Sequence, residues 1–529
     1  MDIKRLHRIQ TTATNAEELS RAHRLLKEYR KTNKTMEGEF LYGTVCIQRD
    51  EPGIAIESLR ESLTINPRFL SGYINLIAAY RAIGDVERAR DQGEMVIDRI
   101  LPTYANERDP QIIGHIAGIY CNTASAHILT GNYERAEKLL QRALVLNPDD
   151  SDSNWNLSIN YLTQNEFAKG WKSYDYGFKT RERYSRPYAQ ELDEWHGQPL
   201  DGKTILVWGE QGIGDEILFA NCLKDLERDA GKVYFDCHPR LHAIFERSFP
   251  NIECRPTRKI LKKDLFDDVD IDFHAPIGSI CKYYRHKIED FPASGYLRPD
   301  PERVEYWKKK IGGQYRVGLS WRGGSPRTQR FSRSLDLDAL AMSLPVFDGD
   351  PDIQFVSFQY DNALEETLAY NKKFGCHLHH FPAALEGYEE TANLAASCDL
   401  IVSVITAVIH LAGAMDVPVW CLVPHAPPWK FPPGERMAWH PSIRQFHQKN
   451  KYDWRHPVLT SITTEFRKWV EERKLLSVLS TQTDTSDTVK TSSKHSVKTG
   501  RKKSSLSSTT KERYSRKDIQ ASSGSPIAK

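Results

Sequence analysis

The stretch Thr204-Ile-Leu-Val-Trp-Gly-Glu-Gln-Gly-Ile-Gly-Asp-Glu216 decides the fold of the C-terminal part of this chain. Its four consecutive apolar residues predict a buried parallel strand, and Gly212 and Gly214 predict a tight turn into a helix. Such a turn presents free backbone N–H groups and the positive end of the helix dipole, which favour phosphate. The sequence therefore predicts a phosphate-binding strand–turn–helix unit.

Residues 1–190, which precede this unit, contain a helical repeat. Ala55 and Ala89 lie 34 residues apart, and one later repeat carries about 13 extra residues around positions 101–109. Small residues at this spacing let paired helices approach closely, which is typical of a tetratricopeptide solenoid. The concave face of such a solenoid commonly binds peptide or protein. We expect the repeats to bind a peptide or protein; the alternative is that they only support the next domain.

Length and composition indicate a multidomain protein. The chain has 529 residues, which is more than one hydrophobic core normally serves. Its apolar content of 40% is enough for ordinary cores. No stretch reaches the roughly 18 apolar residues of a membrane span, and the N-terminus lacks an apolar signal core. We expect a cytoplasmic protein. Nine cysteines without a Cys-x-x-Cys pair predict buried thiols rather than disulfides or a zinc site.

The C-terminal residues 476–529 have a different composition. Residues 481–529 contain 20 Ser and Thr, and 11 Lys and Arg against 4 Asp and Glu. Such a segment has too few apolar side chains to fold alone, so we expect a disordered basic tail. Its cluster Lys498–Lys503 is most simply solvated charge, and nothing else suggests nucleic-acid binding.

The region between repeats and tail alternates short β-branched or aromatic runs with amphipathic helical stretches, as parallel α/β layers do. We expect one Rossmann-like layer in residues 200–305 and a second in 306–475. The first should contain strands 205–208 and 232–236 with a helix 215–229 between them. The second should contain strands 316–321, 353–358, 400–404 and 418–423 and a helix 407–415. A crevice between two such layers commonly holds a nucleotide.

Several motifs in residues 150–455 resemble a known family. They are Gly170-Trp-Lys-Ser-Tyr-Asp-Tyr176, Glu210-Gln-Gly-Ile-Gly-Asp215, Gly318-Leu-Ser-Trp-Arg-Gly-Gly324, Ser403-Val-Ile-Thr-Ala-Val-Ile-His-Leu-Ala-Gly-Ala414 and Ala438-Trp-His-Pro-Ser-Ile-Arg-Gln-Phe446. The chain resembles bacterial tetratricopeptide-repeat proteins fused to a heptosyltransferase-like glycosyltransferase domain of GT-B architecture. The order of domains is also similar to that of O-linked N-acetylglucosamine transferases.

The resemblance implies that the chain moves a sugar from a nucleotide-sugar donor to a protein or glycan acceptor, which the repeats would select. The nucleotide sugar is then a substrate, and no cofactor is expected. The helix that begins at Ala407 contacts the donor in the resembling family. Thr406 and His410 are four residues apart and therefore lie on one face near its N-terminus. Their alternative roles are a helix cap for Thr406 and simple packing for His410.

One position departs from the family. The residue before the threonine is usually acidic there, whereas this chain has Ile405. Isoleucine cannot accept a hydrogen bond from a sugar hydroxyl. Donor recognition therefore differs, or catalysis has been lost and the chain is an interaction scaffold.

A basic loop, Arg322-Gly-Gly-Ser-Pro-Arg-Thr-Gln-Arg-Phe-Ser-Arg333, follows a predicted strand. Arginine's planar fork suits phosphate oxygens, so a leaving diphosphate can be neutralised without metal. The resemblance points to Arg322, Arg333 and Ser334 as donor-binding residues, and we place Gln359 at the border of the donor. Arg327 and Arg330 can equally be solvated.

Asp215 follows the glycine turn, and the resembling heptosyltransferases have an aspartate here that is proposed to take the acceptor proton. The helix N-terminus stabilises the ionised carboxylate, so Asp215 is a weak base unless a closed cleft desolvates it. An ordinary capping carboxylate is the alternative. Glu210 borders the same cleft.

Three other features give weaker evidence of function. His377, His379 and His380 lack an acidic or cysteine partner for a metal. The loop Pro424–Phe431 is aromatic and rigid, and either stacks on a base or sugar or simply packs. Asp236 lies where a dinucleotide-binding fold has its ribose-binding acid, but Ile217 replaces the last glycine of that motif. An oxidoreductase is therefore the weakest of the three interpretations.

Overall fold

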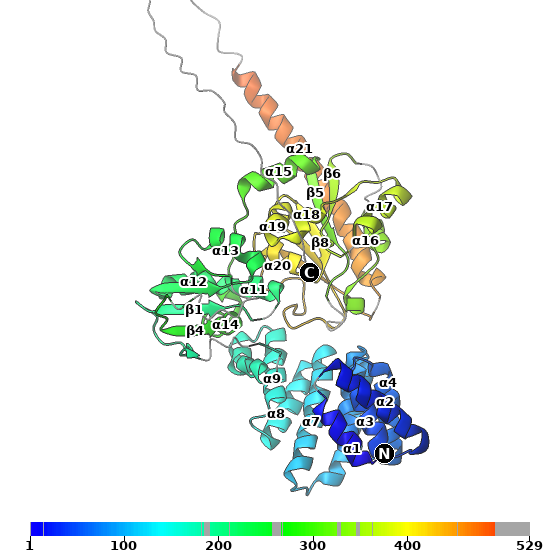
Figure 1. Ribbon diagram of the computed structural model, residues 1–529. Helices are drawn as coiled ribbons and strands as arrows, with labels where there is room; N and C mark the ends of the chain where they lie inside the picture. The colour runs from blue at the N-terminus through cyan, green and yellow to red at the C-terminus, as the bar shows by residue number, and fades with distance from the viewer. Residues whose placement is uncertain are drawn as a thin grey trace, which may run out of the picture. The chain divides into compact units, whose positions relative to one another are not determined.

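The computed structural model describes residues 2–13, 15–180, 182–184, 191–210, 212–256, 266, 268–324, 330–344, 350–361, 363–451 and 453–491 (Figure 1). None of the described helices is long and apolar enough to cross a membrane. All nine cysteines are free thiols, and seven of them are buried.

The N-terminal region consists of antiparallel helix pairs, as the repeat predicts. Its helices are α1 (Ile3–Thr12), α2 (Ala16–Thr32), α3 (Met36–Gln48), α4 (Pro52–Ile65), α5 (Leu70–Ala82), α6 (Val86–Met95), α7 (Pro110–Leu129), α8 (Tyr133–Leu146), α9 (Ser151–Thr163) and α10 (Phe167–Gly170). The fourth, degenerate unit pairs α9 with α10 and the 3-10 segment η3 (Trp171–Phe178).

Helices α3, α5, α7 and α9, the first helices of the four later pairs, are each followed by a residue in the left-handed conformation. These residues are Asp50, Gly84, Gly131 and Asn165, with φ between 60° and 78°. Glycine and asparagine end helices readily because they adopt this conformation at low cost. The interval from Gly84 to Gly131 is longer than the intervals before and after it, because α6 continues through segments Val96–Ile100 and Leu101–Tyr104 before α7 begins. The extra residues therefore lie where the sequence predicts them.

The first α/β layer contains a parallel sheet of order β3-β2-β1-β4. Its strands are β1 (Thr204–Trp208), β2 (Lys232–Asp236), β3 (Glu253–Cys254) and β4 (Phe273–Pro276), and its helices include α11 (Ile213–Phe219), α12 (Leu223–Asp229), α13 (His242–Ser248) and α14 (Ile277–Tyr284).

The helix predicted over 215–229 is interrupted by a 3-10 turn at Ala220–Cys222. The side chain of Asn221 donates a hydrogen bond to the carbonyl oxygen of Leu218 (2.6 Å) and accepts one from Arg285 (2.6 Å). An asparagine side chain that bonds to nearby backbone competes with the helical ladder. The prediction of one continuous helix was wrong for this reason.

The second layer contains a parallel sheet of order β10-β9-β8-β5-β6-β7. Its strands are β5 (Tyr315–Ser320), β6 (Ile353–Ser357), β7 (Leu378–His380), β8 (Leu400–Val404), β9 (Val419–Val423) and β10 (Ile443–His447). Its helices are α15 (Pro301–Ile311), α16 (Leu337–Ser343), α17 (Ala363–Phe374), α18 (Pro382–Glu386), α19 (Tyr388–Ala396) and α20 (Ala407–Gly413). All four predicted strands of this layer are present to within one residue at each end.

Each sheet has a point where the strand order reverses. In the first sheet β1 lies between β2 and β4, and in the second β5 lies between β8 and β6. Ligands of open parallel sheets bind outside the carboxyl ends of the strands at such points. Helices α11 and α20, which follow β1 and β8, pack against each other, and a Cβ on Gly214 would lie 3.4 Å from the Cα of Ala407. The two layers therefore meet at their predicted ligand-binding edges.

The chain continues through Arg455–Leu459 into α21 (Thr460–Thr491). Residues 468–529 form a unit of their own, distinct from 1–467. The predicted tail, 476–529, thus begins within α21. Residues 492–529, including the basic cluster 498–503, lie outside the described residues.

Candidate functional site

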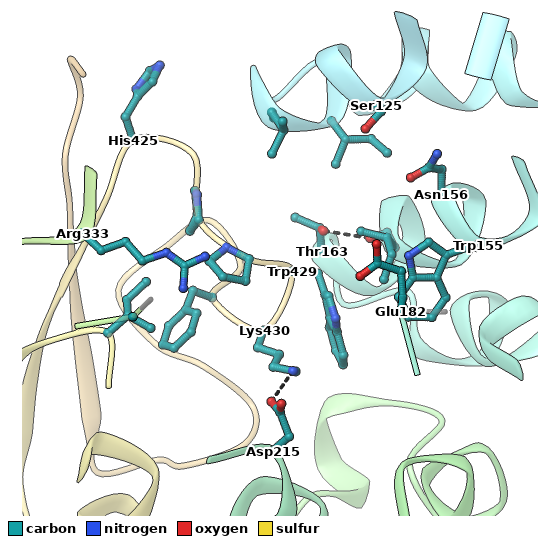
Figure 2. A pocket seen from close by; sticks show the side chains of 18 of the residues that line it. Ser125, Trp155, Asn156, Thr163, Glu182, Asp215, Arg333, His425, Trp429 and Lys430 are labelled. Atoms are coloured by element: carbon teal, nitrogen blue, oxygen red, sulfur yellow. Dashed lines mark hydrogen bonds and ion pairs between the residues drawn. The ribbon is translucent and has the colours of Figure 1, made fainter. Parts of the chain in front are cut away.

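A cavity of about 1430 Å³ is lined by residues of the repeats and by the loops that follow β1, β8 and β9 (Figure 2). It contains most of the predicted site. The predicted residues that line it are Gly212, Gly214, Asp215, Arg333, Thr406, Ala407 and His410.

Asp215 is held by two contacts. Its carboxylate accepts a hydrogen bond from the backbone N–H of Gly212 (3.1 Å) and forms an ion pair with Lys430. The first contact is the helix cap that the sequence offered as an alternative role. The second comes from the loop after β9, so that a carboxylate of one layer is paired with a cation of the other.

Thr406 and His410 lie on the same helix beside the glycine turn. Thr406 occupies the N-cap position of α20, but its side chain accepts no hydrogen bond from the first turn; its hydroxyl lies 3.4 Å from that of Ser403. The first backbone N–H groups of a helix have no partner within the helix, and in α20 the side chain of Thr406 does not supply one. Ile405, which stands in place of the family's acid, also lines the cavity.

Burial keeps His410 neutral. Loss of hydration lowers its pKa to about 3, and the nearby charge of Lys430 adds to the shift. The Nδ1 atom of His410 lies 3.3 Å from Nε2 of His440, whose pKa burial also lowers well below its usual value. His410 is therefore a neutral imidazole in the wall of the cavity.

Arg333 extends into the cavity from the side opposite Ser125 and Asn156 (Figure 2). Within the described ranges, which omit the adjacent residues 325–329, no carboxylate pairs with its guanidinium. Burial lowers the pKa of Arg333 because the charged form loses hydration. A partly buried cation of this kind favours an anionic ligand.

Three predicted residues do not line the cavity. Arg322 forms ion pairs with Asp361 and Glu366 (3.3 and 2.6 Å). The buried amide of Gln359 accepts from the backbone N–H groups of Trp321 and Arg322 (3.2 and 2.9 Å) and so braces the loop after β5.

The third is Ser334, whose hydroxyl donates to the carbonyl oxygen of Arg330 (2.7 Å). Arg330 is not simply solvated, because it pairs with Asp361. Arg327, like Gln211 of the glycine turn, lies outside the described residues.

The predicted aromatic loop 424–431 does border the cavity, through Pro427, Pro428, Trp429, Lys430 and Phe431. Trp429 packs edge-on against Trp171 and Trp439, with ring centroids 6.1 and 5.9 Å apart. These contacts fix the loop against the last repeat and the second layer.

The repeats supply the opposite wall. Asn122 and Ser125 come from α7, and Trp155, Asn156 and Thr163 come from α9 (Figure 2). The same wall also contains the charged residues Arg81 and Asp152, a second aromatic ring, Tyr133, and the aliphatic side chains of Ile128, Leu129 and Ile159, so it is mixed in character.

Glu210 also borders the cavity, but its carboxylate is fully engaged. It forms a bidentate ion pair with Arg183 (2.5 and 2.6 Å) and accepts from the backbone N–H of Gly278 (2.8 Å). Both side chains are fully buried. Arg183 also pairs with Asp175 of η3 (2.9 Å), so this network joins the last repeat to the first layer.

Among the described residues, one group of three potential metal ligands has its ligand atoms within 4.8 Å of one another: His23, Cys46 and Glu51. It lies in the repeats and does not line the cavity. The triplet His377, His379 and His380 is not part of such a group, and burial lowers the pKa of His379 to about 4. Asp236 is likewise absent from the cavity lining.

Sequence reasoning missed Lys430, Arg183 and His440. Lys430 is the one lysine or arginine of the loop 424–431, and this isolated charge in an aromatic loop could have marked it as a candidate. The partners of Arg183 and His440 are 27 and 30 residues away along the chain, and no local pattern marks either pair.

Comparison with known proteins finds the repeat directly: residues 117–150, which cover most of α7 and α8, match the family model of the tetratricopeptide repeat. Protein FlbA of Caulobacter vibrioides (strain ATCC 19089 / CIP 103742 / CB 15) is 29% identical over 327 residues, which cover 58% of this chain and 53% of that protein. The chain thus spans about half the length of this relative.

Two solved structures resemble the α/β part. The glycosyl transferase family 9 protein from Veillonella parvula DSM 2008 is 12% identical and covers 52% of this chain and 97% of its own, with a TM-score of 0.38. The E. coli ADP-heptose lps heptosyltransferase II is 14% identical and covers 51% and 99%, also with a TM-score of 0.38.

The fold assignment rests on the two parallel sheets and their facing carboxyl ends. A tetratricopeptide-repeat region is followed in this chain by an α/β region built on two parallel sheets.

Proposed function

We propose that this protein is a glycosyltransferase that moves a sugar from a nucleotide-sugar donor to a protein or glycan acceptor held by the repeats. The observation that carries the proposal is the shared cavity, where Arg333, Asp215 and α20 share one space with polar residues of α7 and α9.

The donor's diphosphate would lie between Arg333 and the N-terminus of α20. Arg333 offers a planar fork of N–H donors, and the first turn of α20 adds backbone N–H groups. Together they stabilise the negative charge that develops on the diphosphate as the bond to the sugar breaks. In this arrangement protein cations neutralise the leaving group, and no metal is needed.

Asp215 would accept the proton of the attacking hydroxyl. Its ion pair with Lys430 holds the carboxylate at the cavity wall, between the two layers. Transfer of the proton to Asp215 weakens its attraction to Lys430, whose charge can then interact with the departing diphosphate. The pair thus links the base to the leaving group.

The acceptor would enter along the repeat wall. Asn122, Ser125, Asn156 and Thr163 offer neutral hydrogen-bonding groups, and Trp155 offers an aromatic face. Amide and hydroxyl side chains suit either a peptide backbone or sugar hydroxyls.

The proposal is tested by release of nucleoside diphosphate. The full chain is incubated with UDP-, ADP-, GDP- or CDP-sugars, with and without a cell extract as the source of acceptor, and the free diphosphate is measured. We expect one donor to be consumed, and faster with extract. Equal background rates for all four donors would contradict the proposal.

A second function, a catalytically inactive scaffold that acts through its repeats, is favoured by one observation. Ile405 lines the cavity where the resembling family has an acid, so the site lacks that hydrogen-bond acceptor. Donor binding without diphosphate release would support this alternative.

A further inference from the structure

Two buried histidines pair at the back of the candidate donor site. Nδ1 of His410 lies 3.3 Å from Nε2 of His440. His410 lines the cavity, whereas His440 does not. Since Nδ1 of His410 is turned toward His440, its other nitrogen, Nε2, is the one available to the cavity.

The surroundings of His440 leave its own Nδ1 without a partner. This atom is buried, and no described residue hydrogen-bonds to it. The ring stacks on Tyr296 at 6.1 Å, but the Tyr296 hydroxyl donates to the carbonyl oxygen of Ile217 (2.7 Å). The His440 ring also lies against Gly413, where a Cβ would come within 2.7 Å of its Cγ atom.

A neutral pair can share its proton in two ways. If His410 donates from Nδ1, His440 must carry its own proton on Nδ1, where it would be a buried N–H without an acceptor. If His440 donates from Nε2, its Nδ1 is only an unused lone pair. Buried N–H groups without partners are rarer in proteins than unused acceptors, so the second arrangement is favoured.

We propose that His440 is a positioning residue: it donates from Nε2 to His410 and so fixes His410 as the Nε2–H tautomer, which presents a hydrogen-bond donor to an oxygen of the nucleotide sugar. This inference rests on the proposed function for the identity of the ligand. The tautomer itself follows from the geometry of the pair.

The tautomer is measured first. The full chain is labelled with 15N-histidine, and two-bond 1H–15N spectra are recorded at pH 7.5. The chain has 18 histidines, so the two rings are assigned by the signals lost in His410→Ala and in His440→Leu. We expect both rings to be neutral with the proton on Nε2. A proton on Nδ1 of His410, or a charged ring, would overturn the proposal.

The positioning role is measured by donor affinity. His440→Leu removes the donor, whereas His440→Gln keeps an N–H donor on a neutral side chain. By calorimetry with the same four nucleotide sugars, we expect about fivefold weaker binding for the leucine variant and binding within about twofold of wild type for the glutamine variant. Thermal unfolding of both variants checks that they fold.

The outcomes separate the two proposals. Equal affinity of the leucine variant and wild type, or an equal loss in both variants, would overturn the positioning role. If the wild-type chain binds none of the four nucleotide sugars, the proposed function fails, and the ring-nitrogen shifts alone then decide whether His440 fixes the tautomer.

Discussion

Asp215 has two roles that the structure brings together, a helix cap and one half of an ion pair that spans the two layers. Both contacts fix the position of the carboxylate at the cavity, and a general base must be held within hydrogen-bond reach of the proton that it takes.

We therefore expect Asp215→Ala to lower the rate of sugar transfer by about 10²- to 10⁴-fold, the usual contribution of a general base, with donor affinity little changed. Asp215→Asn is the matched control for structure, because its amide oxygen still accepts from Gly212. It should be as inactive as the alanine variant. Unchanged turnover in either would rule out Asp215 as the base.

His410 predicts a pH dependence of stability. Its pKa is about 3 in the folded chain and about 6.5 when unfolded, so below pH 6.5 the unfolded state binds the extra proton. The free energy of unfolding is therefore unaffected by His410 above about pH 6.5 and falls progressively as the pH is lowered toward 3.

At pH 5 we expect the wild-type chain to have lost about 2 kcal/mol through this group relative to pH 7.5. His410→Gln should lose correspondingly less over the same range. Urea denaturation of both proteins at the two pH values measures the difference, and parallel losses would show that His410 is protonated in the folded state.

The predicted site residues that line the cavity are mostly those that a local pattern places directly after a strand. The glycine turn, Asp215, and the Thr406–His410 pair all follow a strand directly, so their position at the carboxyl edge is fixed by the strand. Arg322 follows a strand too, but its side chain turns to Glu366 and Asp361. A sequence pattern does not show which of several arginines has a nearby carboxylate partner.

At the scale of elements, the loops after β5 and β8 come into close contact at Gly323. A Cβ on Gly323 would lie 2.5 Å from the carbonyl oxygen of Ile405 and 2.9 Å from the side chain of Thr406. Backbone cannot yield as a flexible side chain does, so the two loops must separate if this glycine is replaced.

We expect Gly323→Ala to destabilise the chain by about 1–3 kcal/mol, as overpacking does, and to weaken donor binding because it displaces Thr406. Gly387→Ala is the control, since nothing lies within 4 Å of its Cβ position and its φ is −117°. Denaturation midpoints and donor affinity should change in the first variant alone. The same loss in both would place the effect elsewhere.

Strands were predicted more accurately than helices in the α/β part. The buried strands are short apolar runs bounded by glycine or polar residues, so their ends are visible in the sequence. The break between α11 and α12 depends on Asn221 bonding to Arg285, 64 residues away. Local propensity does not contain such a contact.

At the scale of the molecule, the last repeat and the first layer share a core and a buried ionic network. Trp171 of η3 packs among the buried residues of both layers and donates to the carbonyl oxygen of Arg285 (2.6 Å). Arg183 stands between Asp175 of η3 and Glu210 of the glycine turn. The last repeat is therefore part of the fold of the α/β region, whereas the helices before it have a core of their own, and the sequence periodicity alone does not predict this difference.

Removal of Arg183 should be costly because it leaves Glu210 buried and unpaired. We expect Arg183→Ala to lower stability by about 3–5 kcal/mol. Adding Glu210→Gln to Arg183→Met removes both charges while keeping an acceptor for Gly278, and should recover most of this loss. A small loss in the single variant would show that water reaches Glu210.

The central claim is that the cavity binds a nucleotide-sugar donor through Arg333, and calorimetry of the four nucleotide sugars tests it most directly. We compare wild type, Arg333→Ala and Arg330→Ala, where Arg330 comes from the same segment but does not line the cavity. The account predicts micromolar binding of one donor, at least tenfold weaker binding in Arg333→Ala, and little change in Arg330→Ala. Failure of all four donors to bind, or equal binding in Arg333→Ala and wild type, would contradict it.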